Sequence, residues 1–106
     1  MKSYTDLSQS RKLAEFLPLE SADMYYEWPN KKVHFKDDEY SGMGFSCWSL
    51  SALLKLLPKS ARLEKGNVTE LCRVVLPVEL EASDWCVEPI DACYEMIIHL
   101  HELNLL

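Results

Sequence analysis

The chain has 106 residues, of which 48% are hydrophobic and 26% charged, with a formal net charge of −6. This composition predicts one globular domain and excludes a disordered chain. The acidic balance argues against a nucleic-acid partner bound by phosphate neutralisation, and no apolar run approaches the roughly 20 residues of a membrane span. Residues 1–16 also contain no apolar signal region, so we expect a cytoplasmic protein with no membrane partner.

The first predicted element is a helix over residues 5–18. Thr5 or Ser3 can cap its start. Pro18 ends it, because the residue before a proline is disfavoured in helical conformation. The apolar side chains fall on one side of this helix: Leu7, Leu13, Ala14 and Leu17.

A β-hairpin is predicted next. Residues 22–28 are rich in aromatics and alternate with a period of two, which is typical of a strand. The stretch "PNKK" at residues 29–32 favours a turn. Residues 33–36 are the candidate returning strand, and residues 37–44 form a polar loop.

The strongest helical pattern covers residues 46–59. Ser46 is a candidate cap, and Pro58 ends the helix. Leucines spread over more than half of its circumference: Leu50, Leu53, Leu54, Leu56 and Leu57. Such a helix needs cover on more than one face, by a sheet together with another helix or a partner chain.

The second half of the chain predicts another hairpin and a last helix. Residues 61–67 are a candidate linker, and residues 71–80 read as an extended strand that Pro77 restricts to an edge or a bulge. A turn at residues 81–84 and a short strand at residues 85–88 follow. The predicted order is helix, hairpin, helix, hairpin, helix.

The last helix starts at Pro89, which suits the first helical position, and Asn104 can end it in the left-handed conformation. A helical wheel separates an apolar stripe from a polar one. The apolar stripe predicts a core face: Ile90, Cys93, Tyr94, Ile97 and Leu100. The opposite stripe predicts a solvated face: Asp91, Glu95, His99 and Glu102.

The histidines of this helix do not form a metal site. His99 and His101 are two residues apart, so they point about 200° away from each other. A shared metal needs a spacing of three or four residues on one helix. We expect His99 to be exposed beside Glu95 and Glu102, and His101 to be partly buried.

Four cysteines complete the inventory of reactive groups: Cys47, Cys72, Cys86 and Cys93. Their spacing matches neither a C-x-x-C redox motif nor a zinc site. We therefore expect four reduced thiols that behave as small buried hydrophobes, with no metal and no cofactor. The sequence also lacks a Gly-rich phosphate loop, G-x-S-x-G and H-E-x-x-H, so it predicts no catalytic residue.

Three stretches of the sequence stand out together: "ESADMYYEW" at residues 20–28, "CWSLSALLKLLP" at residues 47–58, and "PIDACYEMIIHLHELNLL" at residues 89–106. They resemble a family of short uncharacterised proteins encoded by Bacteroides-type gut bacteria, often in prophage-like or mobile segments. The C-terminal stretch is the most specific part, and residues 62–87 match less well. The resemblance implies a compact α+β domain of bacterial or phage origin, and it implies no activity.

The pattern predicts an α+β domain over residues 1–106, with three helices packed on one face of a small, mostly antiparallel sheet. The favoured hypothesis is a non-enzymatic interaction or accessory module that self-associates or binds another protein. One alternative is a small enzyme or ligand-binding protein whose site is assembled from distant residues such as His34, Asp84 and His101. Another is an acidic, phage-type inhibitor that occupies a nucleic-acid-binding protein by presenting carboxylates.

Self-association is expected because one small sheet covers only part of the Leu-rich helix. Aromatic residues cluster in and after the first hairpin, and aromatic side chains are enriched at protein interfaces. We predict a homodimer whose interface draws on this cluster: Tyr25, Tyr26, Trp28, Tyr40 and Trp48.

Overall fold

The computed structural model describes residues 2–27, 31–37, 44–66, 71–77 and 81–105. In these residues the helices are α1 (Leu7–Ala14), the 3-10 turn η1 (Leu19–Ser21), α2 (Leu50–Leu56) and α3 (Pro89–Glu102). The strands are β1 (Met24–Tyr26), β2 (Val33–Phe35), β3 (Phe45–Cys47), β4 (Arg62–Lys65), β5 (Cys72–Leu76) and β6 (Glu81–Ala82). The predicted α+β class is confirmed.

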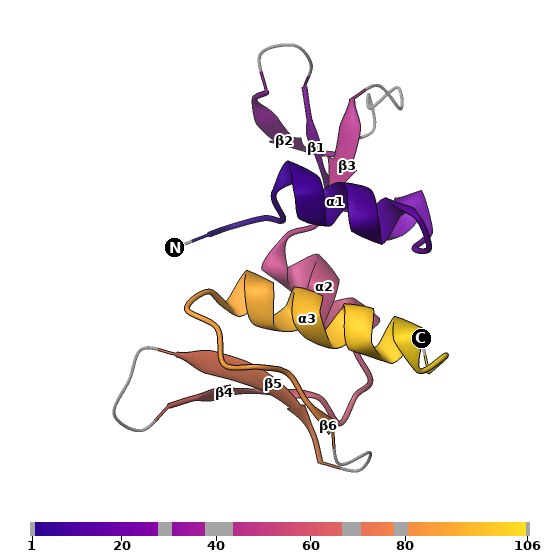
Figure 1. Ribbon diagram of the computed structural model, residues 1–106. Helices are drawn as coiled ribbons and strands as arrows, with labels where there is room; N and C mark the ends of the chain where they lie inside the picture. Colours follow the sequence, from indigo (N-terminus) through magenta and orange to yellow (C-terminus); the bar gives the residue numbers. More distant parts are fainter. Residues whose placement is uncertain (1, 28–30, 38–43, 67–70, 78–80, 106) are drawn as a thin grey trace.

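The strands form two sheets rather than the single sheet that the sequence predicts. Each described sheet is antiparallel and three-stranded, with the orders β2-β1-β3 and β4-β5-β6. The sheets lie at opposite ends of the molecule, and the helices lie between them (Figure 1). The second sheet has its own third strand because the predicted linker at residues 61–67 contributes β4, which pairs with β5. The second hairpin is therefore already paired and does not join the first.

Residues 62–87 depart furthest from the prediction. Pro77 directly follows β5, so it ends a central strand instead of marking an edge. The predicted turn at residues 81–84 begins with β6, which pairs with the end of β5. The predicted strand at residues 85–88 is reduced to one bridge between Cys86 and Cys72.

The helix starts differ from the sequence assignment by a few residues. Asp6 caps α1 through a capping box: its carboxylate accepts from the backbone N–H of Gln9 at 2.8 Å, and the Gln9 side chain accepts from the Asp6 N–H at 3.1 Å. Ser49 caps α2 in place of Ser46, because Ser46 is part of β3. Helix α3 starts at Pro89 as predicted.

One core cluster draws on both halves of the chain, including Leu13 of α1 and Val74 of β5. The Leu-rich helix and the apolar stripe of α3 both contribute to this core, since Leu53, Leu57, Ile97 and Leu100 are buried. The leucines on the remaining faces of α2 are mostly covered within the chain, since Leu50 and Leu56 are partly buried against this cluster. Leu54 stays 44% exposed.

Candidate interaction surface

The outer edge of β2 carries the most accessible apolar strand residue of the first sheet. The strand order β2-β1-β3 places β2 at an edge. Phe35 is 67% exposed, and Val33 is half-buried. Both residues belong to a three-residue strand whose other side pairs with β1. An exposed apolar edge strand is a template for pairing with another chain.

The hydrogen-bond phase of the β1–β2 ladder shows which backbone groups face outward. Two bonds flank the ladder: Lys36 N–H to Asp23 O at 2.9 Å, and Glu27 N–H to Lys32 O at 2.6 Å. Bonded and non-bonded pairs alternate along antiparallel strands, so the central pair Tyr25–His34 is a bonded one. Val33 and Phe35 then direct their N–H and C=O groups away from β1, toward the edge that no other described strand pairs with.

An open hollow of about 670 Å³ lies beside this edge. It is lined by Leu19, Glu20, Ala22, Asp23, Phe35, Lys36 and Ser46. Leu19, on η1, is 54% exposed, so it extends the apolar surface of Phe35 across the hollow. The lining therefore combines two large apolar side chains with charged groups of both signs.

Lys36 fastens η1 to the sheet inside this hollow. Its ammonium group donates to the backbone oxygen of Leu19 and to the hydroxyl of Ser46, both at 3.0 Å. Burial lowers the pKa of Lys36, and this effect outweighs the raising effect of nearby acidic groups that include Asp23 and Glu20. The lysine thus acts as a positioning contact that holds Leu19 next to β2.

The predicted interface residues divide between the core and the surface. Trp48 is 0% exposed and donates its indole N–H to Ser21 at 3.0 Å, so it has no surface to offer a second chain. Tyr26 is also buried. These two assignments were wrong because alternation and aromatic content mark burial as strongly as they mark an interface. Tyr25 is half-buried against the His34 ring. Trp28 and Tyr40 lie outside the described residues.

The edge residues Val33 and Phe35 were missed at the sequence level. The available signal was the alternation of apolar and polar residues in "VHFK" between two polar loops. Only the strand order shows that these residues are at an edge.

The three residues of the distributed-site hypothesis do not converge. His34 lies in β2 and contacts Glu27 at 2.8 Å. Asp84 follows β6, a strand of the sheet at the opposite end of the molecule (Figure 1). His101 is near the end of α3, where its ring stacks on Phe16 with centroids 3.8 Å apart. The three residues thus belong to three different parts of the fold: β2, the segment after β6, and the end of α3.

The two histidines of α3 have the reverse of the expected environments. His99 is half-buried, and its Nε2 lies 2.7 Å from a carboxylate oxygen of Glu81, on β6. His101 is exposed, although one face of its ring is covered by Phe16. A helical wheel shows only neighbours on the same helix, whereas the partner of His99 is Glu81, on a strand of the second sheet.

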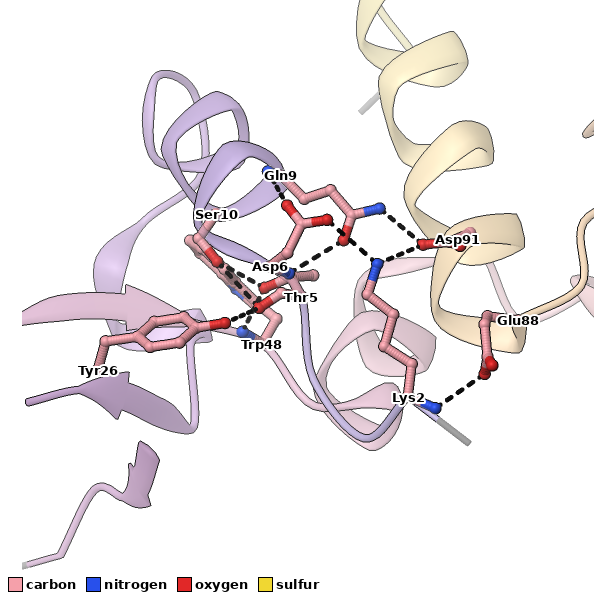
Figure 2. Close-up of polar contacts among 9 residues, drawn as sticks. All are labelled: Lys2, Thr5, Asp6, Gln9, Ser10, Tyr26, Trp48, Glu88 and Asp91. Atoms are coloured by element: carbon pink, nitrogen blue, oxygen red, sulfur yellow. Dashed lines mark hydrogen bonds and ion pairs between the residues drawn. The ribbon is translucent and has the colours of Figure 1, made fainter. Parts of the chain in front are cut away.

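A buried polar cluster joins the start of the chain to the first sheet (Figure 2). Thr5 is 0% exposed. Its hydroxyl accepts from the Trp48 backbone N–H at 3.0 Å and lies 2.8 Å from the Ser10 hydroxyl. Its backbone oxygen accepts from the Tyr26 hydroxyl at 2.9 Å. Because each of these groups is paired, the cluster stabilises the fold and leaves no polar atom directed at a ligand.

Lys2 links the same region to α3. Its ammonium group lies 2.7 Å from Asp91 and 3.2 Å from Asp6, and its backbone N–H donates to Glu88 at 2.8 Å (Figure 2). Burial opposes the charged form of Lys2, but the two carboxylates prevail and raise its pKa. Three carboxylates are thereby committed to contacts within the chain.

Among the described residues, no group of three or more His, Cys, Asp or Glu side chains could hold a metal ion. Within the same residues, no helix is long and apolar enough to cross a membrane. Comparisons with protein-family models, curated proteins and solved structures found no match.

Proposed function

We propose that this chain is a non-enzymatic interaction module that self-associates by pairing β2 with β2 of a second copy. The observation that carries the proposal is the open edge of β2, where Phe35 is 67% exposed and the backbone groups of Val33 and Phe35 face outward. A bacterial or phage origin, taken from the sequence resemblance, belongs to the same proposal.

Pairing of two β2 strands fits the symmetry that most homodimers adopt. Antiparallel strands related by a two-fold axis contribute the same surface from each copy. Main-chain hydrogen bonds across the new ladder supply affinity, while the apolar side chains supply specificity. Two three-stranded sheets would merge into one continuous sheet, which covers the β2 edge of each copy and leaves β3 as the outer strand.

Electrostatic repulsion between the two copies is expected to weaken this association. Each copy carries a net charge of −6, so two copies repel one another. A ladder centred on His34 also places Lys32 of one copy opposite Lys36 of the other, and like charges directly opposed are destabilising. Added salt screens both repulsions, so dimerisation is expected to strengthen as ionic strength rises.

The test is the mass in solution, measured by light scattering after gel filtration over a range of protein and salt concentrations. Wild-type protein is expected to approach twice the monomer mass as both concentrations increase. Phe35→Lys places a charge at the edge, and Val33→Pro removes an outward N–H that β1 does not use. Both variants are expected to remain folded monomers.

Val87→Lys is the matched control, because Val87 is also 67% exposed but lies outside the first sheet, between β6 and α3. It is expected to dimerise like the wild type. A wild-type monomer at high micromolar concentration would overturn the proposal, and so would equal loss of dimer in Val87→Lys and Phe35→Lys. A monomer that instead captured extended peptides at β2 would replace the second copy with another partner.

The acidic-inhibitor alternative has less support from the described surface. It requires an array of free carboxylates on one face, whereas Asp6, Glu88 and Asp91 are bound to Lys2.

A further inference from the structure

Cys72 and Cys86 lie directly opposite each other. They form an antiparallel bridge in which each backbone N–H donates to the carbonyl of the other at 2.7 Å. The Sγ of Cys72 lies 3.3 Å from the backbone oxygen of Cys86, and the Sγ of Cys86 lies 3.5 Å from the backbone oxygen of Asp84. The two cysteines are 14 positions apart in the sequence.

This arrangement places both residues within reach of a disulfide. Residues that exchange both backbone bonds have Cα atoms about 5.5 Å apart, inside the range of about 4.4–6.8 Å for disulfides. Directly opposed Cβ atoms are about 4.5–5.5 Å apart, and a pair that exchanges both backbone bonds lies at the wider end of that range. A disulfide brings the Cβ atoms to about 3.5–4.5 Å, so the bridge must close by about 1–2 Å when the bond forms.

Access differs among the four thiols. Cys47, Cys72 and Cys93 are buried, whereas Cys86 is only half-buried. A reagent in solution therefore meets Cys86 first, and Cys72 is the neighbouring thiol that can resolve the first product. Cysteines that are oxidised reversibly are accessible, often lie beside a resolving cysteine and have a low pKa; Cys86 meets the first two conditions, and its raised pKa restricts the reaction to alkaline pH.

We infer that Cys72 and Cys86 are a reversible modification site, at which a small-molecule disulfide such as oxidised glutathione converts two thiols into an internal disulfide. In the first step the Cys86 thiolate attacks one sulfur of glutathione disulfide, forms a mixed disulfide and expels one glutathione thiolate. In the second step Cys72 loses its proton and attacks Sγ of Cys86, which expels the second glutathione. Two electrons pass from the protein to the reagent, and the two thiol protons leave with the two glutathione molecules.

The surroundings raise the pKa of both thiols, so the reaction is slow at neutral pH and needs alkaline pH. Burial raises the pKa of Cys86, and the negative charges of Glu95, Asp91 and Asp84 raise it further. Burial also raises the pKa of Cys72, with Glu88 and Asp91 adding to the effect and Lys65 opposing it. Because the thiolate is the attacking species, oxidation is expected to accelerate as pH rises toward and above the ordinary thiol range.

Oxidation is also expected to stabilise the fold. The new bond closes a loop that contains β6 and joins β5 to the segment that leads into α3. Loops of this length produce an increase in Tm on the order of 10 °C when cross-linked. A reducing agent such as dithiothreitol is expected to reverse the increase.

The test uses the full chain, incubated with oxidised glutathione at alkaline pH and then mapped by proteolysis and mass spectrometry without reduction. The expected product is a monomer that has lost two hydrogen atoms and contains one peptide pair linked through Cys72 and Cys86. Cys72→Ser is expected to accumulate the mixed disulfide at Cys86, because the resolving thiol is gone. Cys86→Ser is expected to form no internal disulfide.

Cys93→Ala and Cys47→Ala are controls that should retain the 72–86 link. The wild-type peptide map stands by itself if a serine variant fails to fold. Linkage of a different cysteine pair would overturn the inference. It would equally be overturned by disulfide-linked dimers without the internal bond, or by a folded wild type that forms no disulfide.

Discussion

Replacing Thr5 with valine tests the buried polar cluster at the start of α1. Valine has nearly the shape of threonine, so the packing changes little while the hydroxyl disappears. The Trp48 backbone N–H then loses the acceptor that it reaches at 3.0 Å. Ser10 loses its 2.8 Å partner but keeps a longer contact to the Thr5 backbone oxygen at 3.4 Å.

The magnitude follows from the number of buried groups that lose a partner. A buried donor left without an acceptor destabilises the folded state by about 1–3 kcal/mol. Full loss at Trp48 and partial loss at Ser10 together predict about 2–4 kcal/mol. That is a large fraction of the ~5–15 kcal/mol that stabilises a typical domain, and it lowers Tm by on the order of 10–20 °C.

Urea unfolding followed by circular dichroism measures this loss directly. Thr5→Ser is the matched control, because it retains the hydroxyl and removes one methyl group, for a loss of about 1 kcal/mol. If Thr5→Val were as stable as the wild type, the cluster would contribute nothing. If Thr5→Ser lost as much as Thr5→Val, packing of the methyl group would explain the whole effect.

Ile97→Ala is expected to destabilise the fold by about 2–5 kcal/mol, because Ile97 is fully buried. Ile98→Ala is the control and should destabilise the fold clearly less, because Ile98 is only partly buried. Equal melting curves for the wild type and Ile97→Ala would show that this face of α3 is not part of the core. Asp6→Ala removes the cap that binds Gln9 and should lower stability by about 1 kcal/mol in urea titrations, and an unchanged midpoint would contradict the cap. Burial raises the pKa of Tyr26 to about 12. Since the ordinary value is about 10, its contribution to stability is complete below pH ~10 and disappears as pH rises toward the folded value. A tyrosinate absorbance titration should show a late component that is smaller in Tyr26→Phe and does not vanish, because burial also raises the pKa of Tyr94. Identical titrations would refute the assignment.

The helices were predictable because their signals are local. Pro89 at the first position of α3 and the apolar stripe through Ile97 and Leu100 both lie within one continuous segment. The left-handed end at Asn104, with φ of 58°, also follows from local conformational preference. Such features need no knowledge of the rest of the chain.

The strands were less predictable because their pairing depends on distant residues. β4 has the sequence RLEK, which is polar enough to resemble a linker until Leu63 is placed opposite Val74. β3 was assigned to a helix because Ser46 is as good a cap as Ser49 by residue type alone. The candidate interaction surface has the same difficulty: "VHFK" predicts a strand, but the edge position of β2 follows only from the order β2-β1-β3.

The contacts of Lys2 have a consequence for the order in which the molecule is made. Lys2 lies 89 positions before Asp91, which its ammonium group contacts. Gln9, whose side-chain amide donates to the same carboxylate at 2.8 Å, lies 82 positions before it. Synthesis proceeds from the N-terminus, so α1 leaves the ribosome long before its partner on α3 exists. Until then Leu13 lacks the α3 side of its core cluster, and the α1 region stays open to solvent. We therefore expect the two sheets to fold as one cooperative unit, and a fragment that ends before α3 to remain unfolded although it contains every strand of the first sheet.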